Sequence, residues 1–246
     1  AVLANRIIAT LLVRDGLLVK GKRFVNDRRV GSIMQAARVF EMRGIDELAL
    51  LDVDASADGR LFDVGLLREI TDELFMPVAV GGGIKTLDDV RELMEHGADK
   101  IIIGKHAATL QIILDAARSF GTQAVCVSCD YSDTDNHVPG EHICTARTVV
   151  DYAKRMEEWG AGEILLQSID RDGTLTGYDL YTIKLVSSSV NVPVIASGGA
   201  GNVQDFIDAF RHGASACSAG AIWQFTQTTP RDVKIKMRAE GIPVRL

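Results

Sequence analysis

The chain of 246 residues carries 27 basic and 33 acidic side chains, a formal net charge of −6, and 47% hydrophobic residues. This composition is typical of a globular protein that buries a sizeable core, and no Lys/Arg run indicates a nucleic-acid or membrane-surface partner. No apolar window is long enough to span a membrane, and no leader-like stretch precedes Arg6. Four cysteines do not make a secreted disulfide framework, so we expect a cytoplasmic protein.

Short apolar runs rich in Val, Ile and Leu alternate with amphipathic stretches such as residues 87–94. Such runs are typical of strands buried on both faces of a parallel sheet. The length is close to the roughly 250 residues of one (β/α)₈ barrel, and no linker divides the chain. We therefore predict an α/β fold with a single (β/α)₈ TIM-barrel domain over residues 1–246. The expected strands are residues 6–13, 47–53, 77–80, 100–103, 124–129, 163–168, 193–196 and 216–219.

An internal repeat favours the closed barrel over a doubly wound sheet. Residues 76–83 match residues 192–199 at an offset of 116 residues, and the same offset pairs Asp89 with Asp205. It also pairs residues 96–98 with residues 212–214, in both cases His-Gly-Ala. Because one gapless offset covers separate segments, we expect two fused half-barrels of four strands each.

Two expected strands end in glycine clusters, at residues 81–83 and 198–201. The active site of such a barrel lies at the carboxyl ends of its strands. Glycine lets backbone N–H groups approach an anion closely, although it also serves any tight turn. Two clusters in repeated positions favour two phosphate sites, which suit a substrate phosphorylated at both ends.

Several motifs occur together in one order along the chain. They are Val80-Gly81-Gly82-Gly83-Ile84, residues 164–174 (ILLQSIDRDGT) followed by Gly177-Tyr178-Asp179, residues 195–201 (IASGGAG) and the closing Val244-Arg245-Leu246. On these motifs the chain resembles the cyclase subunit family of imidazole glycerol phosphate synthase over nearly its whole length. The resemblance implies a glutaminase partner that docks on the N-terminal face of the barrel. It also implies that the released ammonia crosses the barrel interior to a phosphorylated small molecule at the other face.

The resemblance further assigns roles to individual positions. A charged ring that gates the ammonia passage matches Arg6, Glu47, Lys100 and Glu163, each at or near the start of a strand. A salt-bridge layer that closes the barrel floor is a compatible structural alternative. No metal and no cofactor are expected. The positions expected to bind substrate or phosphate are Lys20, Asp52, Gly82, Gly83, Gly104, Lys105, Asp172, Gly173, Gly198, Gly199, Gly220 and Ala221.

The chain departs from the family where the chemistry takes place. The family uses two aspartates as acid and base, at the ends of the first and fifth strands. Asp130 matches the second aspartate, but Leu12 occupies the place of the first, and leucine cannot move a proton. Gly104-Lys105 replaces an Asn-Thr pair, and a lysine there can still bind phosphate as a point charge. Gln167 replaces a small hydroxyl residue.

This pattern resembles a paralogous branch that accompanies sugar amidation in bacterial surface-polysaccharide pathways. In that branch the barrel and its glutaminase supply ammonia to a separate amidotransferase, which converts an acetamido sugar to an acetamidino sugar. One alternative is an authentic cyclase of histidine biosynthesis, in which Asp54 replaces the missing carboxylate. Another is a non-catalytic scaffold that only activates the glutaminase.

Three further features are interpreted from their positions. Lys20 matches a mobile-loop lysine of the family, and is either a phosphate contact or a solvated loop charge. Cys126 and Cys129 are three residues apart on one strand and point to opposite faces, so core packing is expected rather than shared metal binding. His137, Glu141, His142 and Cys144 could bind a metal, but their spacing matches no standard site.

Overall fold

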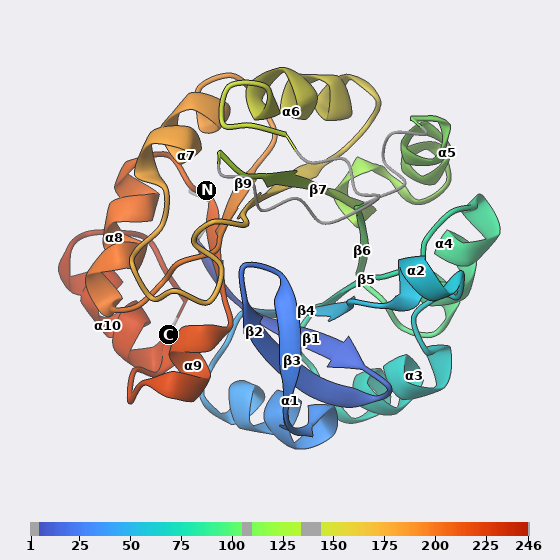
Figure 1. Ribbon diagram of the computed structural model, residues 1–246, viewed down its shortest axis with the longest axis horizontal. Coiled ribbons are helices and arrows are strands. Elements are labelled where there is room, and N and C mark those ends of the chain that lie inside the picture. Colours follow the sequence, from blue (N-terminus) through green and yellow to red (C-terminus); the bar gives the residue numbers. More distant parts are fainter. Residues whose placement is uncertain (1–4, 105–109, 134–143, 246) are drawn as a thin grey trace.

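Eight parallel strands form a closed barrel in the computed structural model, which describes residues 5–104, 110–133 and 144–245. Each strand pairs with the next in chain order, and the last pairs with the first through Arg6 and Ala216. Figure 1 looks into this ring of strands, with the helices outside it. The predicted (β/α)₈ barrel is confirmed. Its strands are β1 (Arg6–Arg14), β4 (Glu47–Asp52), β5 (Val78–Gly81), β6 (Lys100–Ile103), β7 (Val125–Tyr131), β8 (Glu163–Ser168), β9 (Val194–Ser197) and β10 (Ala216–Ala219).

Amphipathic helices cover the outside of the barrel. In α1, the buried residues Ile33, Ala37 and Phe40 recur at the spacing that places them on one face. Within the described residues, no helix is both long enough and apolar enough to cross a membrane. The helices are α1 (Ile33–Met42), α2 (Ala55–Asp58), α3 (Val64–Glu73), α4 (Leu87–Glu95), α5 (Gln111–Phe120), α6 (Val149–Glu158), α7 (Leu180–Ser187), α8 (Val203–Arg211), α9 (Ala221–Phe225) and α10 (Pro230–Ala239), with a 3₁₀ turn η2 (Thr122–Ala124).

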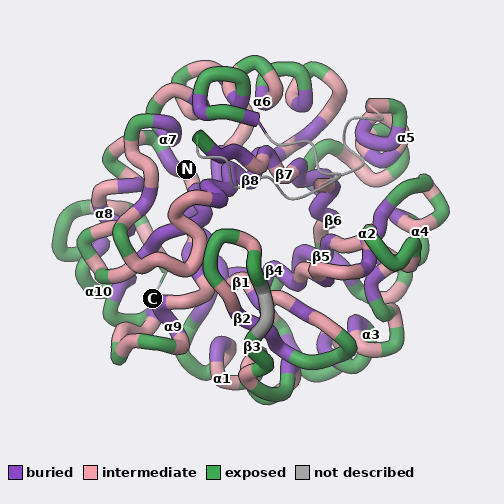
Figure 2. Tube along the Cα trace, viewed as in Figure 1, coloured by how far each residue is buried: buried purple, intermediate pink, exposed green. Residues whose placement is uncertain are grey.

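Side chains of the strands alternate between two cores. Ile7 of β1 packs in the large outer core beneath the helices, whereas Ile8 joins a separate cluster inside the barrel. Cys126 lies in the inner cluster and Cys129 in the outer core, as the strand period predicted. Figure 2 shows the strands as a largely buried ring. Because of this alternation, every second side chain of a strand points toward the barrel axis, where a binding site can form.

The half-barrel repeat extends to the secondary structure. The bounds of β4, β5 and β6 become those of β8, β9 and β10 at the offset of 116 residues, and α1 and α4 become α6 and α8. The helix caps also repeat, because Thr86 and Asp89 form a capping box on α4 and Asn202 and Asp205 form one on α8. The expected two-fold repeat is therefore confirmed.

An antiparallel hairpin, β2 (Leu17–Lys22) and β3 (Val25–Ser32), follows β1 and was not predicted. β2 pairs with the last residues of β1, where Leu12 lies opposite Val19. The dipeptide Asp15-Gly16 joins them with positive φ angles of 51° and 72°, and Asp-Gly is a favoured two-residue hairpin turn. That dipeptide was the signal that could have revealed the hairpin.

Candidate functional site

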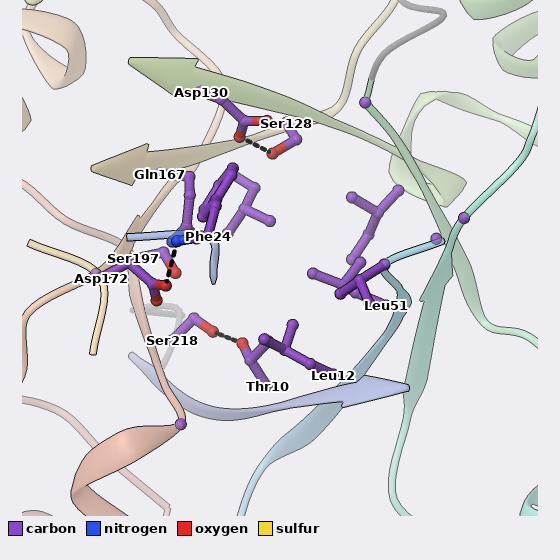
Figure 3. Close-up of a pocket in the computed structure, with 18 of the residues that line it drawn as sticks. Thr10, Leu12, Phe24, Leu51, Ser128, Asp130, Gln167, Asp172, Ser197 and Ser218 are labelled. Carbon is purple, nitrogen blue, oxygen red and sulfur yellow. Dashed lines mark hydrogen bonds between the residues drawn. The ribbon is translucent and has the colours of Figure 1, made fainter. Parts of the chain in front are cut away.

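A cavity of about 420 Å³ opens at the carboxyl ends of the barrel strands. Its lining has two contrasting sides, visible in Figure 3. Asp130, Gln167 and Ser197 belong to a polar side from β7, β8 and β9, whereas Leu12 and Leu51 belong to an apolar side from β1 and β4. The strand alternation places all of these side chains toward the axis.

The polar side contains several hydroxyl and carboxyl groups. Ser128 Oγ donates a hydrogen bond of 2.7 Å to Asp130 Oδ1, and the hydroxyls of Thr10 and Ser218 are also hydrogen-bonded to each other. Gln167 and Ser197 are only 9% and 8% exposed, and both line the same cavity. Their polar side chains are therefore placed to contact a ligand there.

The apolar side contains Leu12, the position at which the sequence resemblance predicts a catalytic aspartate. Leu12 reaches the cavity beside Leu51, and Ile102 of β6 continues this wall. Asp54, the conceivable replacement for the missing carboxylate, accepts hydrogen bonds of 2.5 and 3.1 Å from the Arg14 guanidinium. The Asp54 carboxylate is therefore engaged by Arg14 in this structure.

The first glycine cluster follows β5. Gly82 and Gly83 have φ angles of 127° and 75°, and a Cβ on Gly83 would lie 1.7 Å from the carbonyl oxygen of Arg60. Asp52 lines the cavity, but its carboxylate accepts hydrogen bonds from the Ala55 amide and the Arg60 guanidinium. Asp52 therefore fixes Ala55 and Arg60, and the backbone of Arg60 lies against Gly83. Gly104 also lines the cavity, whereas Lys105 lies outside the described residues.

The second glycine cluster follows β9. Gly198 and Gly199 have φ angles of 92° and 108°, and a Cβ on Gly199 would lie 2.1 Å from the carbonyl oxygen of Gly177. Only glycine allows this backbone path at no steric cost. Both glycines line the same cavity as Gly173, Gly220 and Ala221, so these five residues lie together, and their binding of a phosphate stays a prediction.

Lys20 lies in β2 and is only 5% exposed, so its interpretation as a solvated loop charge is wrong. The reason is the hairpin, which packs this residue against the barrel. Its Nζ donates a hydrogen bond of 3.2 Å to the carbonyl oxygen of Thr10. Burial lowers the pKa of Lys20 to about 8, against the opposing effect of the Asp172 charge.

Asp172 also lines the cavity and holds the hairpin in place. Its Oδ2 accepts a hydrogen bond of 3.3 Å from the Phe24 amide, and its carbonyl oxygen accepts one of 3.0 Å from the Arg23 amide. Burial raises the pKa of the Asp172 carboxyl, partly offset by the Phe24 amide and the Lys20 charge. The β8–α7 connection and the β2–β3 hairpin therefore meet above the second glycine cluster.

The four predicted gate residues form a closed ring at the opposite end of the barrel. Arg6 donates to Glu47 Oε2 at 2.7 Å and to Glu163 Oε1 at 2.5 Å. Lys100 Nζ lies 3.1 Å from Glu47 Oε2 and 2.9 Å from Glu163 Oε2. Burial alone would lower the pKa of Arg6, but the two glutamates raise it above its usual value. Each cation therefore contacts both anions.

An apolar layer separates this ring from the cavity. It contains Ile8, Ala49, Ala79, Ile102, Cys126, Leu165, Ile195 and Ala216. A void of about 10 Å³ lies within it, bordered below by Glu47 and above by Ser218. This void is comparable to the space that one water molecule occupies.

Within the described residues, no three His, Cys, Asp or Glu side chains are placed to hold a metal ion. Cys144 is buried, 5% exposed, in the outer core. His137, Glu141 and His142 lie outside the described residues, so the structure does not address the suggested metal site in that loop.

Comparison with known proteins identifies the family. A family model described as "Histidine biosynthesis protein" matches residues 6–229, which is most of the chain. The chain belongs to this family. It is 42% identical over 250 residues to the imidazole glycerol phosphate synthase subunit HisF of Prosthecochloris aestuarii (strain DSM 271 / SK 413), covering 99% of the chain and 100% of that protein. It is 40% identical over 251 residues to HisF of Hydrogenobaculum sp. (strain Y04AAS1), with the same coverage.

A third HisF protein, from Endomicrobium trichonymphae, is 41% identical over 249 residues, covering 99% of the chain and 96% of that protein. These matches confirm the resemblance that the motifs indicated. Membership of the HisF-like family therefore rests on the whole chain as well as on its glycine clusters.

Proposed function

We propose that this chain is the barrel subunit of a glutamine amidotransferase pair, and that it conducts ammonia but lacks efficient cyclase chemistry. One observation carries the proposal. The charged ring is complete at the floor of the barrel, while Leu12 lies at the mouth where the family needs an acid.

The barrel interior supports passage of a small neutral molecule. From the ring of Arg6, Glu47, Lys100 and Glu163, the axis passes one apolar layer with its small void and then reaches the cavity. Transfer of an ammonium ion into such a layer has a large desolvation free energy, whereas transfer of neutral ammonia does not. The layer thus favours ammonia over its charged form.

The N-terminal face of the barrel offers a docking surface for the glutaminase. Met42 ends α1 and Phe75 follows α3, and the two are 79% and 95% exposed. The Phe75 amide donates to Glu41 Oε1 at 2.7 Å, which holds these connections side by side. Exposed large apolar side chains are a common feature of protein–protein contact surfaces.

The loss of one acid explains why cyclase activity would be impaired. Asp130 remains at the end of β7 with its hydrogen bond from Ser128, but no second carboxylate faces it from β1. General acid–base catalysis contributes about 10²- to 10⁴-fold to a rate, so the missing partner is a large deficit. We propose that the ammonia instead serves a separate sugar amidotransferase that makes an acetamidino sugar for surface polysaccharide.

The test is an ammonia-dependent cyclase assay with the HisF substrate, run on wild type and Leu12→Asp together. We expect no turnover by wild type and a gain in the variant. Wild-type turnover near that of a true HisF would overturn the proposal. The conduit is tested with the glutaminase bound: Arg6→Ala and Lys100→Ala should alter the transfer of glutamine-derived ammonia, and unchanged transfer would favour a scaffold that only activates the glutaminase.

A second candidate is an authentic cyclase subunit of histidine biosynthesis. The 40–42% identity to three HisF proteins over nearly the whole chain favours it. Rescue of a histidine auxotroph that lacks its own cyclase would support this candidate. Failure of that rescue, by a chain that still conducts ammonia, would support the first.

A further inference from the structure

We propose that Lys20 is a nucleophilic amine that forms an imine with a phosphorylated aldose or ketose bound in the cavity. The inference goes beyond ammonia transfer and does not require a glutaminase partner.

The position of Lys20 carries the first step of the argument. Its side chain runs from β2 into the cavity wall, and Nζ is hydrogen-bonded to the Thr10 carbonyl oxygen at 3.2 Å. Within the described residues, no carboxylate forms an ion pair with this ammonium. The absence of a side chain on Gly220 is what accommodates it, since a Cβ there would lie 2.4 Å from Nζ. The site therefore holds a buried amine without a counter-ion in contact.

Burial makes this amine reactive. The neutral form of a lysine is the nucleophile, and an apolar environment favours it. With a pKa of about 8, roughly a tenth of Lys20 is neutral at pH 7, against well under a thousandth for an exposed lysine. The charge of Asp172, which also lines the cavity, acts in the opposite direction and raises the pKa of Lys20.

The surroundings of Lys20 define the class of ligand. The open backbone at Gly173, Gly198 and Gly199 borders the same cavity and suits a phosphate group. Gln167 and Ser197 add polar side chains to the adjoining wall of the cavity, and these side chains suit sugar hydroxyls. A phosphorylated sugar in its open-chain form has both features and also carries the carbonyl that an amine attacks.

The step is balanced within the site. The Nζ lone pair attacks the carbonyl carbon, and one of the two Nζ protons passes to the carbonyl oxygen to give a carbinolamine. The hydroxyl group then leaves with the second Nζ proton as water, and the C=N bond forms. Asp172, whose pKa burial raises, is suited to carry these protons. No oxidant or reductant is needed.

The test uses glyceraldehyde 3-phosphate as the probe on the intact chain. Sodium borohydride supplies a hydride that converts the imine to a stable secondary amine, and peptide mass spectrometry locates the adduct. We expect Lys20 to be labelled at least tenfold more than any exposed lysine, with inorganic phosphate suppressing the labelling. Lys22→Arg, which changes an exposed residue of the same strand, should retain the adduct, whereas Lys20→Arg should lose it.

Two results would overturn the proposal. One is labelling spread over exposed lysines while Lys20 is spared. The other is equal labelling of Lys20 by glyceraldehyde without its phosphate, which would show that the cavity does not direct the reaction. Both readouts come from wild-type protein, so they stand even where the Lys20→Arg variant fails to fold.

Discussion

Leu12 at the end of β1 and Asp130 at the end of β7 lie on opposite sides of one cavity (Figure 3). Asp130 therefore faces a hydrocarbon side chain at the position where the resemblance predicts a second carboxylate. Leu12 extends a wall that Leu51 and Ile102 also form.

Leu12→Asp is expected to raise the ammonia-dependent cyclase rate from background by about 10²-fold or more, the range of a positioned general acid or base. The apolar wall should also raise the pKa of the new carboxyl and favour its acid role. Leu12→Asn is the matched control, since it has nearly the same shape but cannot transfer a proton. Equal rates for both variants would contradict the prediction.

Lys100→Met tests the energy of the charged ring. Lys100 contacts two glutamates whose side chains are only 5% and 10% exposed, so its removal leaves buried negative charge with only Arg6 to balance it. We expect a loss of about 2 kcal/mol in the free energy of unfolding, measured by urea denaturation. Lys236→Met is the control, because it breaks an exposed helical pair with Glu240 and should leave the midpoint unchanged. Similar midpoints for both variants would refute a stabilising ring.

Lys20→Met tests burial of the amine through its pH dependence. The folded pKa of about 8 lies below the usual 10.5, so between these values the unfolded chain binds more protons than the folded one. The free energy of unfolding of the wild type should therefore rise with pH across that window. At pH 7 the buried charge costs up to about 3 kcal/mol, so the variant should be the more stable protein there.

The advantage of Lys20→Met should shrink between pH 8 and pH 10.5 as the wild-type lysine loses its proton in the folded state. Urea denaturation at pH 7 and pH 10 measures this difference. Lys22→Met, at an exposed site on the same strand, should show no such trend. A pH-independent gap between wild type and Lys20→Met would argue against the buried amine.

Gly199→Ala tests the second glycine cluster. The positive φ of 108° and the 2.1 Å approach of a Cβ to the Gly177 carbonyl oxygen require the backbone to move. We expect a loss of at least about 2 kcal/mol in stability, together with weaker phosphate binding by calorimetry. Gly104→Ala is the control for stability, because among the described residues the nearest atom to a Cβ there is Ser128 Cβ, at 4.0 Å. Equal melting temperatures for the two variants would contradict this account.

Several features could be predicted from the sequence because they depend on local pattern. The apolar runs and their alternation predicted all eight barrel strands to within two residues at each end. The gapless repeat predicted the half-barrels, and glycine at positions 82, 83, 198 and 199 predicted backbone that other residues rarely adopt. Each of these patterns lies within a few residues or recurs at a constant spacing, so it can be recognised in the sequence without knowledge of the tertiary structure.

The burial of Lys20 could not be predicted in the same way, although the Asp15-Gly16 dipeptide could have revealed the hairpin itself. Val19 and Lys20 of β2 are buried because the hairpin folds back along β1, while Asp172, about 150 positions away in the chain, fixes its turn. Burial, and with it the pKa of the amine, is a property of the packed barrel and leaves no mark in the local pattern.

The sequence by itself determined the barrel, its repeat, and the apolar residue Leu12 near the end of the first strand, because strand period and residue identity are local. Only the tertiary structure decided which groups meet. Closing the barrel brings Arg6, Glu47, Lys100 and Glu163 from four strands into one ring, and it places Leu12 beside Leu51 and Ile102 in a single wall. Contacts between side chains far apart in the chain depend on the register in which the strands close, and that register is set by the packing of the whole barrel.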